Sequence, residues 1–483
     1  MGEDNKLQRK LGPRQMNMIA IGGAIGTGLF VALGQSISTA GPGGSMLAYG
    51  VIGIAVFFVM NALGEMSTYT PVPGAFETFG SRYVDKSFGF MMGWNYWFCC
   101  AFTMGTELVA SAIIMKFWFP DSSSVMWSAI FLALILVLNL FSTSIYGESE
   151  FWFAGIKFVT IIIFIFVGFL MILGIVSGND NAGFQNWTKG DAPFVGGGWA
   201  TFSILMVAGF SFIGVEATAV AAGEAKDPDK TVPKAINSVF WRILIFYIGG
   251  IFIIGTLVPH DDPNLLAADI DNVAVSPFTL VFSHAGIKFA AHLMNAVILT
   301  SVLSCGNSTM YEASRLLFSM SQQHRAPKIF GKLSKRHVPV FAVLITSAIS
   351  LVCFLSGPNG DSVVYTWLYN GTGLTGFITW FGVCYTHLRF RKAFAVQGHS
   401  INELKFKAKL FPVGTWFALI ACVIVIIGQA YWYVGFGEID WLGLTIAFMG
   451  IPFALILWIG HKVVTKTKLI PYDEIVLKGG DDY

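Results

Sequence analysis

The sequence predicts an all-α integral membrane protein with about twelve transmembrane helices. Of its 483 residues, 55% are hydrophobic and only 12% are charged, whereas soluble domains carry about 25% charged residues. The mean hydropathy is +0.66, and apolar runs of about 20 residues, long enough to cross a hydrocarbon core about 30 Å thick, recur along the chain. There are too few charges to cover a water-facing surface, so we expect the chain to lie in a lipid bilayer.

The apolar runs define the expected spans in order. They lie near residues 17–40, 45–67, 89–118, 125–146, 151–177, 198–223, 238–258, 286–320, 339–356, 363–387, 412–433 and 440–462. The eighth span is unusually long. We expect its later part, with Asn307, Glu312 and Arg315, to be an amphipathic half at the cytoplasmic side.

The positions of the basic residues predict the orientation. Segments that would face the cytoplasm carry nearly all the lysine and arginine, and the outer segments carry Lys189 with Lys116 and Lys288 near helix ends. Such an asymmetry fits an even number of spans with both termini inside. We therefore expect a multi-pass protein of the cytoplasmic (inner) membrane, with cytoplasmic tails at residues 1–16 and 463–483.

Two of the spans contain segments that predict interrupted helices. Residues 22–28 hold four glycines in seven positions, and residues 209–216 (GFSFIGVE) again mix small and polar residues into an apolar span. A broken helix at membrane depth persists where it lines a cavity or ligand. Free amides at such a break can hold a carboxylate, and free carbonyls can hold an ammonium, as an amino acid requires.

The interruptions fall five spans apart, which predicts an inverted repeat of five plus five helices with broken helices 1 and 6. The first repeat would cover residues 17–177, the second 198–387, and helices 11 and 12 residues 412–462. Close packing of glycines would explain one run but not its counterpart with Glu216. A phosphate loop is excluded because no Gly-Lys-Ser/Thr follows the first run.

Several motifs carry a family resemblance. Residues 18–30 (MIAIGGAIGTGLF), 40–44 (AGPGG), 93–97 (GWNYW), 221–224 (AAGE), 276–279 (SPFT) and 295–300 (NAVILT) resemble the amino acid permeases of the amino acid–polyamine–organocation superfamily. The resemblance covers residues 7–460. It implies secondary transport of an amino acid without a cofactor, and the segments 221–228, 240–244, 276–286 and 397–404 point within the family to L-lysine.

The resemblance also implies roles for particular residues. An amino acid would bind between helices 1 and 6, at Ala24, Gly26, Thr27 and Gly28. Sodium-coupled relatives hold a cation where helices 1, 5 and 8 meet, and Lys157 would replace it, so that a proton is the coupling ion. The alternative is that Lys157, about two turns into its expected span, reaches the cytoplasmic surface.

Ionisable residues inside the membrane are functional candidates by default. Glu216, beside the second break, would receive a substrate ammonium or the coupled proton; otherwise it only caps the unwound backbone. Tyr96, Cys100, Thr103 and Glu107 recur at helical spacing on one face of helix 3. We expect Tyr96 and Glu107 to line the pathway, with pairing of Glu107 to another helix as the alternative.

Further candidates concern closure of the pathway. Phe210 and Phe212 flank the second break and would form an aromatic lid, or merely pack. Glu65 and Glu224 would form inner-gate ion pairs or ordinary interfacial pairs, and Asp269 would attract substrate at the outer mouth or be a solvated loop charge.

The sequence thus predicts a proton-coupled importer of L-lysine that works by alternating access. Its partners would be L-lysine or a related amino acid and the lipid bilayer, without nucleic acid. One alternative is another substrate, such as arginine, an aromatic amino acid or 4-aminobutyrate, and another is an amino-acid sensor in the membrane. We expect no enzyme, because no nucleophile–base grouping and no metal-type cluster is found.

Overall fold

Helices joined by turns and loops make up the residues described by the structure of the chain, a computed structural model. These are residues 11–12, 14–16, 18, 25–30, 32–72, 74–141, 143–176, 184–266, 276–284, 288–434 and 441–477. Within them no strand forms, and an isolated parallel bridge joins Leu11 to Ala225.

The helices follow one another with short connections. They are α2 (Thr27–Phe30), α3 (Ala32–Tyr69), α4 (Ala75–Tyr83), α5 (Lys86–Met115), α6 (Ser124–Leu140), α7 (Thr143–Ile172), α8 (Gly197–Ser203), α9 (Leu205–Phe212), α10 (Ala217–Ala221), α11 (Pro228–Arg242), the π-helical η4 (Ile243–Ile248), α12 (Gly249–Leu257), α13 (Pro263–Leu266), α14 (Pro277–His284), α15 (Lys288–Gln322), α16 (Val340–Ser350), α17 (Ser356–Asn359), α18 (Asp361–Val396), α19 (Val413–Val434), α20 (Trp441–Phe448) and α21 (Gly450–Thr465). Short 3₁₀ turns are η2 (Gln185–Trp187), η3 (Ala222–Glu224), η6 (Lys328–Gly331), η7 (Leu351–Leu355) and η8 (Ile401–Glu403).

Six helical stretches of the described residues are long and apolar enough to cross a membrane. They are Ala32–Tyr69, Lys86–Met115, Ser144–Ile172, Gly197–Ala221, Lys230–Leu257 and Val340–Asn359, and shorter apolar helices cover Ser124–Leu140, Val413–Gln429 and Gly450–Thr465. The predicted membrane character is confirmed at this level. The count of twelve and the five-plus-five repeat stay predictions.

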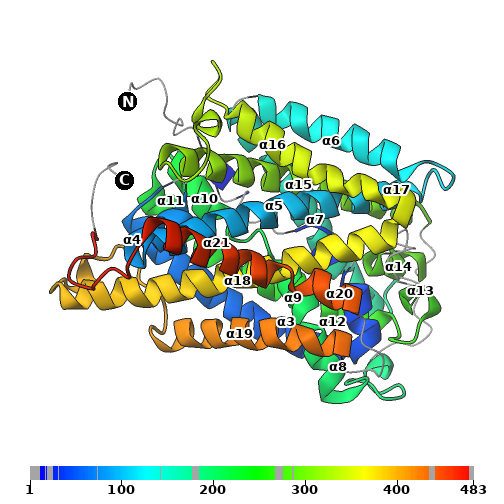
Figure 1. Cartoon of the computed structure of the whole chain (residues 1–483). Coiled ribbons are helices and arrows are strands. Elements are labelled where there is room, and N and C mark those ends of the chain that lie inside the picture. The colour runs from blue at the N-terminus through cyan, green and yellow to red at the C-terminus, as the bar shows by residue number, and fades with distance from the viewer. Residues whose placement is uncertain are drawn as a thin grey trace.

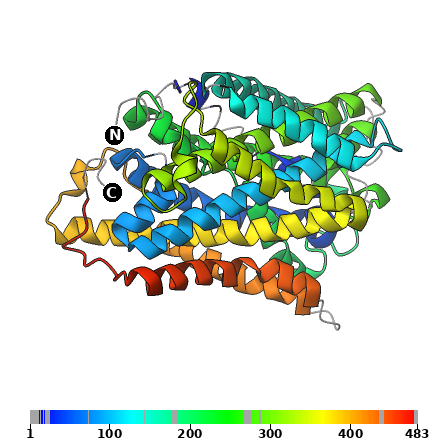
Figure 2. The ribbon, with the colours of Figure 1, turned by 45° about the horizontal axis from the view of Figure 1, so that its top comes forward.

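The long helices lie side by side as one bundle (Figure 1). The helices α4, α10 and α11 lie at one end of it, which we call the α4 end, and α13, α14 and α17 lie at the opposite end. In the turned view of Figure 2, α18 runs the length of the bundle, and it packs on α5. The helix α5 is the most enclosed of the apolar stretches, because 89% of its most apolar window is buried.

Two helix boundaries differ from the sequence prediction. The helix α7 begins at Thr143, eight residues before the expected start of the fifth span, because Thr143–Glu150 continues the helix although it carries polar residues. The helix α3 covers Ala32–Tyr69 as one element, with a kink where Gly41 has a φ of 73° and Pro42 follows. That kink separates the expected first and second spans.

The later part of α15 is not amphipathic, so that expectation was wrong. Asn307, Glu312 and Arg315 are each at most 2% exposed. Neighbouring helices cover every side of this segment, since α15 packs on α5, α7 and α10. Its polar side chains are therefore buried inside the protein.

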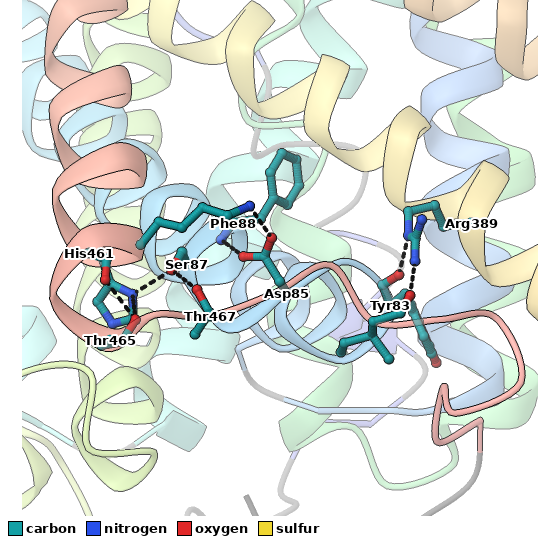
Figure 3. A network of polar contacts seen from close by, with 10 residues as sticks. Tyr83, Asp85, Ser87, Phe88, Arg389, His461, Thr465 and Thr467 are labelled. Carbon is teal, nitrogen blue, oxygen red and sulfur yellow. Dashed lines mark hydrogen bonds and ion pairs between the residues drawn. The ribbon is translucent and has the colours of Figure 1, made fainter.

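Residues 466–477, after α21, lie across the α4 end and are called here the C-terminal strap. Arg389 of α18 clamps the strap to the α4–α5 turn, because its Nε donates to the Tyr83 carbonyl at 2.6 Å and its Nη2 donates to the Ile470 carbonyl. The Ile470 amide donates to the Val84 carbonyl at 3.0 Å. Figure 3 shows the two contacts of Arg389 beside a second polar group around Ser87.

Apolar side chains secure the far part of the strap. Ile475 and Leu477 are 2% and 4% exposed, and Gln397 Nε2 donates to the carbonyls of Tyr472 and Ile475 at 2.9 and 2.7 Å. The part of the expected tail at 463–483 that the structure describes is thus packed on the bundle.

Candidate functional site

The first helix interruption lies immediately before α2. Ile25 and Gly26 are not helical, and α2 begins at Thr27. A Cβ on Gly26 would lie 2.7 Å from Glu107 Oε1 and 3.0 Å from Cys305 Sγ. An added side chain would therefore displace Glu107 and press on Cys305, and glycine lets this backbone contact α5 and α15 together. Ala24, which the sequence also places in the site, lies outside the described residues.

The second interruption separates α9 from α10, as the sequence predicts. Ile213 is extended, Gly214 has a φ of 94°, and Glu216 directly precedes α10. The positive φ explains the glycine, because other residues are strained in this region. A helix thus ends and restarts within an apolar span. Between the two halves the amides of Ile213, Val215 and Ala217 donate to the carbonyls three residues earlier, and the Glu216 carboxylate interacts with the backbone of Gly214 and Glu216.

The two interrupted helices meet at Gly28 and Ser211. A Cβ on Gly28 would come closer than 3.0 Å to Ser211 Cα, a distance that real Cβ atoms essentially never show. Ser211 Oγ donates to the Gly28 carbonyl at 2.8 Å. The Tyr247 hydroxyl donates to the Ser211 carbonyl at 2.5 Å, and the Tyr49 hydroxyl lies 3.1 Å from Ser211 Oγ. This junction is closely packed and hydrogen-bonded on both sides.

The two phenylalanines of the expected lid lie in different surroundings. The Phe210 ring lies 4.0 Å from the Tyr369 ring, measured between centroids. The Phe212 ring is fully buried and packs 4.3 Å from the Tyr247 ring. Phe212 thus belongs to the tyrosine cluster of the junction, which matches the packing alternative.

Opposite charges lie on either side of the first interruption. Thr27 Oγ1 donates to Glu107 Oε1 at 3.1 Å, and Lys157 Nζ donates to the Ile25 carbonyl at 2.8 Å. Both charged side chains are buried. Lys157 does not reach the surface, because α7 starts at Thr143 and places it 14 residues, or about 21 Å, along the helix.

Glu216 lies at the second interruption together with two residues from other helices. Trp380 Nε1 donates to Glu216 Oε2 at 3.4 Å. The Tyr96 hydroxyl donates to Glu312 Oε2 at 2.5 Å and also interacts with the Glu216 carboxylate. Tyr96 thus lies at this acidic centre rather than beside Glu107. Thr103, which the sequence places on the same face of this helix, donates to the carbonyl of Cys99 in its own helix at 2.8 Å.

Sequence reasoning misses Glu150 and Glu312 as buried charges. Glu150 is fully buried and accepts from Ser304 Oγ at 2.5 Å; hydropathy places it in a loop, but α7 starts earlier than expected and includes it. A signal for Glu312 exists in the sequence, because the polar residues of 307–315 point to all sides of a helix and not to one face. Such a pattern favours a buried polar segment over an amphipathic one.

The expected inner-gate glutamates lie at the α4 end in buried ion pairs. Arg315 Nε lies 3.2 Å from Glu224 Oε1, which also accepts from the Tyr311 hydroxyl at 2.7 Å. Glu65 Oε1 lies 3.0 Å from His387 Nε2, and Glu65 Oε2 accepts from Arg391 Nη2 at 2.7 Å. The pairs connect α3 with α18 and η3 with α15. Asp269 lies outside the described residues.

The six cysteines are free and buried. They lie in the apolar body of the bundle, as expected from their positions in apolar stretches.

Comparison with known proteins agrees with this geometry. The family model described as "Amino acid permease" matches residues 15–471. The chain is 49% identical to the lysine-specific permease LysP of Escherichia coli, covering 98% of this chain and 97% of the relative. It is 44% identical to the lysine-specific permease LysP of Lactococcus lactis (99% and 94% covered) and 43% identical to the histidine permease HisP of the same species (99% of both). The chain belongs to the amino acid permease family of the amino acid–polyamine–organocation superfamily, a family of multi-pass membrane transporters.

Proposed function

We propose that the chain is a proton-coupled importer of L-lysine in the cytoplasmic (inner) membrane, with both termini in the cytoplasm. The observation that carries the proposal is the pair of opposite charges at the first interruption, Glu107 on one side and Lys157 on the other. The two lysine-specific relatives support the choice of substrate.

The α-groups of the substrate would bind to the interrupted backbone. Amides near Gly26 to Gly28 and the Thr27 hydroxyl would hold the carboxylate, because a helix N-terminus favours an anion. The α-ammonium would bind carbonyls near Ala24 and at the second interruption. These contacts use no side chain of the substrate, and so they suit any amino acid.

The charge of the substrate side chain requires separate partners. An unpaired ammonium in a buried site is prohibitively costly, and Glu107 or Glu216 would neutralise it. Both carboxylates are buried at the interruptions. Two more buried carboxylates interact with this group, Glu150 with Lys157 and Glu312 with Glu216. The four carboxylates outnumber the two buried cations, Lys157 and Arg242, the second of which interacts with Glu216. This excess of negative charge favours a cationic substrate.

Lys157 would couple transport to protons. Its ammonium donates a hydrogen bond to the carbonyl of Ile25, the residue directly before Gly26. Loss of the proton from Lys157 would weaken that contact and release helix 1, and regaining the proton would restore it. One helix bundle would then rock against the other around the site.

Uptake into proteoliposomes tests substrate and coupling together. Labelled lysine should enter when a proton gradient is imposed without sodium, and unlabelled lysine should compete. The 43% identity to a histidine permease makes histidine the second candidate, and stronger competition by histidine than by lysine would favour it. A requirement for sodium would contradict the role of Lys157, and binding without translocation would favour a sensor.

A further inference from the structure

Glu312 is a buried carboxylate to which the proposed function assigns no contact with the substrate. It is 1% exposed and lies on α15. Its Oε2 accepts from the Tyr96 hydroxyl at 2.5 Å, whereas Oε1 is buried without a hydrogen-bond partner among the described residues. A buried acceptor without a partner is costly. The position is therefore suited to an additional donor.

Glu216 faces the same point from the second interruption. The Tyr96 hydroxyl interacts with both carboxylates, and the two carboxylates interact with each other. Two carboxylates buried this close repel one another unless a cation or a proton lies between them. The other ionisable groups that interact with Glu312 are Cys99, Cys100, Tyr146, Glu150 and Cys305, and none of them supplies a positive charge. Glu216 interacts with the buried Arg242 guanidinium, so the positive charge on this side of the pair belongs to Glu216, and the second oxygen of Glu312 stays the unpaired acceptor.

This acidic centre lies apart from Glu107 along the same two helices. Tyr96 precedes Glu107 by 11 residues on α5, and Glu312 follows Cys305 by seven residues on α15. At 1.5 Å per residue these separations are roughly 16 and 10 Å along the helix axes. Both displace the second centre toward the α4 end, where Gln323, just after α15, donates to Thr78 of α4 at 2.9 Å.

We propose that Glu312 and Glu216, with Tyr96 between them, form a second cation-binding subsite, which receives the side-chain ammonium of a dibasic amino acid. The subsite rests on the proposed function for its substrate class. An ammonium has three donors, so it can bind both carboxylates and fill the unpaired acceptor on Glu312. Glu312 is then a specificity-determining residue that favours cationic over neutral side chains of the same length.

Competition uptake with the Glu312→Gln variant tests the subsite. Labelled lysine is taken up by proteoliposomes in the presence of unlabelled lysine or norleucine, which has the same side-chain length without the ammonium. The ratio is the half-inhibitory concentration of norleucine divided by that of lysine. It should fall by about tenfold or more in Glu312→Gln, because a buried charge partner of the lysine ammonium is lost. Glu148→Gln, which removes a carboxylate that is 48% exposed, should leave the ratio unchanged.

Two further variants keep the test decisive. Glu312→Asp retains the charge and should retain most of the lysine preference. If Glu312→Gln is not folded, Tyr96→Phe and Glu312→Asp are compared for lysine and norleucine binding by thermal shift, and Tyr96→Phe should lower the ratio. An unchanged ratio in folded Glu312→Gln overturns the proposal. A variant that changes only the pH dependence of uptake, with an unchanged ratio, also overturns it, since Glu312 would then hold a proton and not the substrate ammonium.

Failure of the proposed function is a separate result. It appears in the unaltered protein, as absence of lysine uptake, whereas failure of the subsite appears only when the variant is compared with it.

Discussion

Substitution of Gly28 by alanine should separate the two interrupted helices. The added Cβ would lie closer than 3.0 Å to Ser211 Cα, whereas ordinary contact begins at 3.4 Å. The helices must therefore move apart by more than 0.4 Å, and the hydrogen bond from Ser211 Oγ to the Gly28 carbonyl at 2.8 Å lengthens with them. Overpacking of this kind costs about 1–3 kcal/mol.

This strain acts on substrate binding because binding needs both interruptions at once. If the helices relax apart in the empty protein, bringing them together again costs the same free energy. At 1.4 kcal/mol per factor of ten, lysine should bind roughly 5- to 140-fold more weakly. Lysine-dependent thermal stabilisation of the purified protein measures this affinity, and initial uptake rates in proteoliposomes provide an independent readout.

Gly155→Ala is the matched control. Gly155 lies in α7, and no atom of the described residues outside its own helical turn lies within 4 Å of the place that an added Cβ would take. Alanine should therefore fit there and even favour the helix slightly. If Gly28→Ala binds lysine within twofold of the unaltered protein, the close junction does not position the substrate, and the reasoning fails.

Three further predictions follow from other contacts. Lys157→Met should abolish lysine uptake driven by a proton gradient while lysine–lysine exchange persists, and the control Lys189→Met, at an exposed position, should keep both activities. Gradient-driven uptake by Lys157→Met would contradict the coupling role. Ile475→Ala should weaken the docking free energy of the strap by about 2 kcal/mol, which raises the undocked population roughly 30-fold and speeds proteolysis of the strap. Val476→Ala, at a 47% exposed position, should be cleaved at the rate of the unaltered protein, and equal cleavage of both variants would argue against docking. The hydrogen bond from Lys189 lowers the pKa of the Asp261 carboxyl, so this exposed pair stabilises the fold above the unfolded pKa of about 4 and loses its effect as the pH falls through the lower folded value. Thermal melts of Lys189→Ala should show a small loss of stability at pH 7, which begins to shrink near pH 4 and vanishes below the folded pKa, and a loss that grows in acid would reverse the sign.

The sequence predicts the membrane class and the two interruptions well, for a physical reason. Glycine is required at Gly28 by contact with the Ser211 backbone and at Gly214 by a positive φ, so the residue type itself reports the geometry. Glu107 and Lys157 are found in the same way, because an ionisable residue in an apolar span is rare and costly.

Side-chain partners across helices cannot be predicted from one sequence. Nothing local indicates that Tyr96 bonds Glu312, which lies 216 residues later. The burial of Glu150 and Glu312 depends on which helices surround α7 and α15. Hydropathy alone assigns Glu150 to a loop and Glu312 to the amphipathic end of a span. Phe212 shows the same limit, because its tyrosine partners come from α3 and η4.

The C-terminal strap has a consequence for biogenesis. Its contacts join the end of the chain to the α4–α5 turn and to α18. Because residues 466–477 are synthesised after the α4–α5 turn and α18, the strap can dock only once those partners have been translated. Resistance of the strap to protease is thus an assay for completed assembly, and a reporter fused after Leu477 would preserve it.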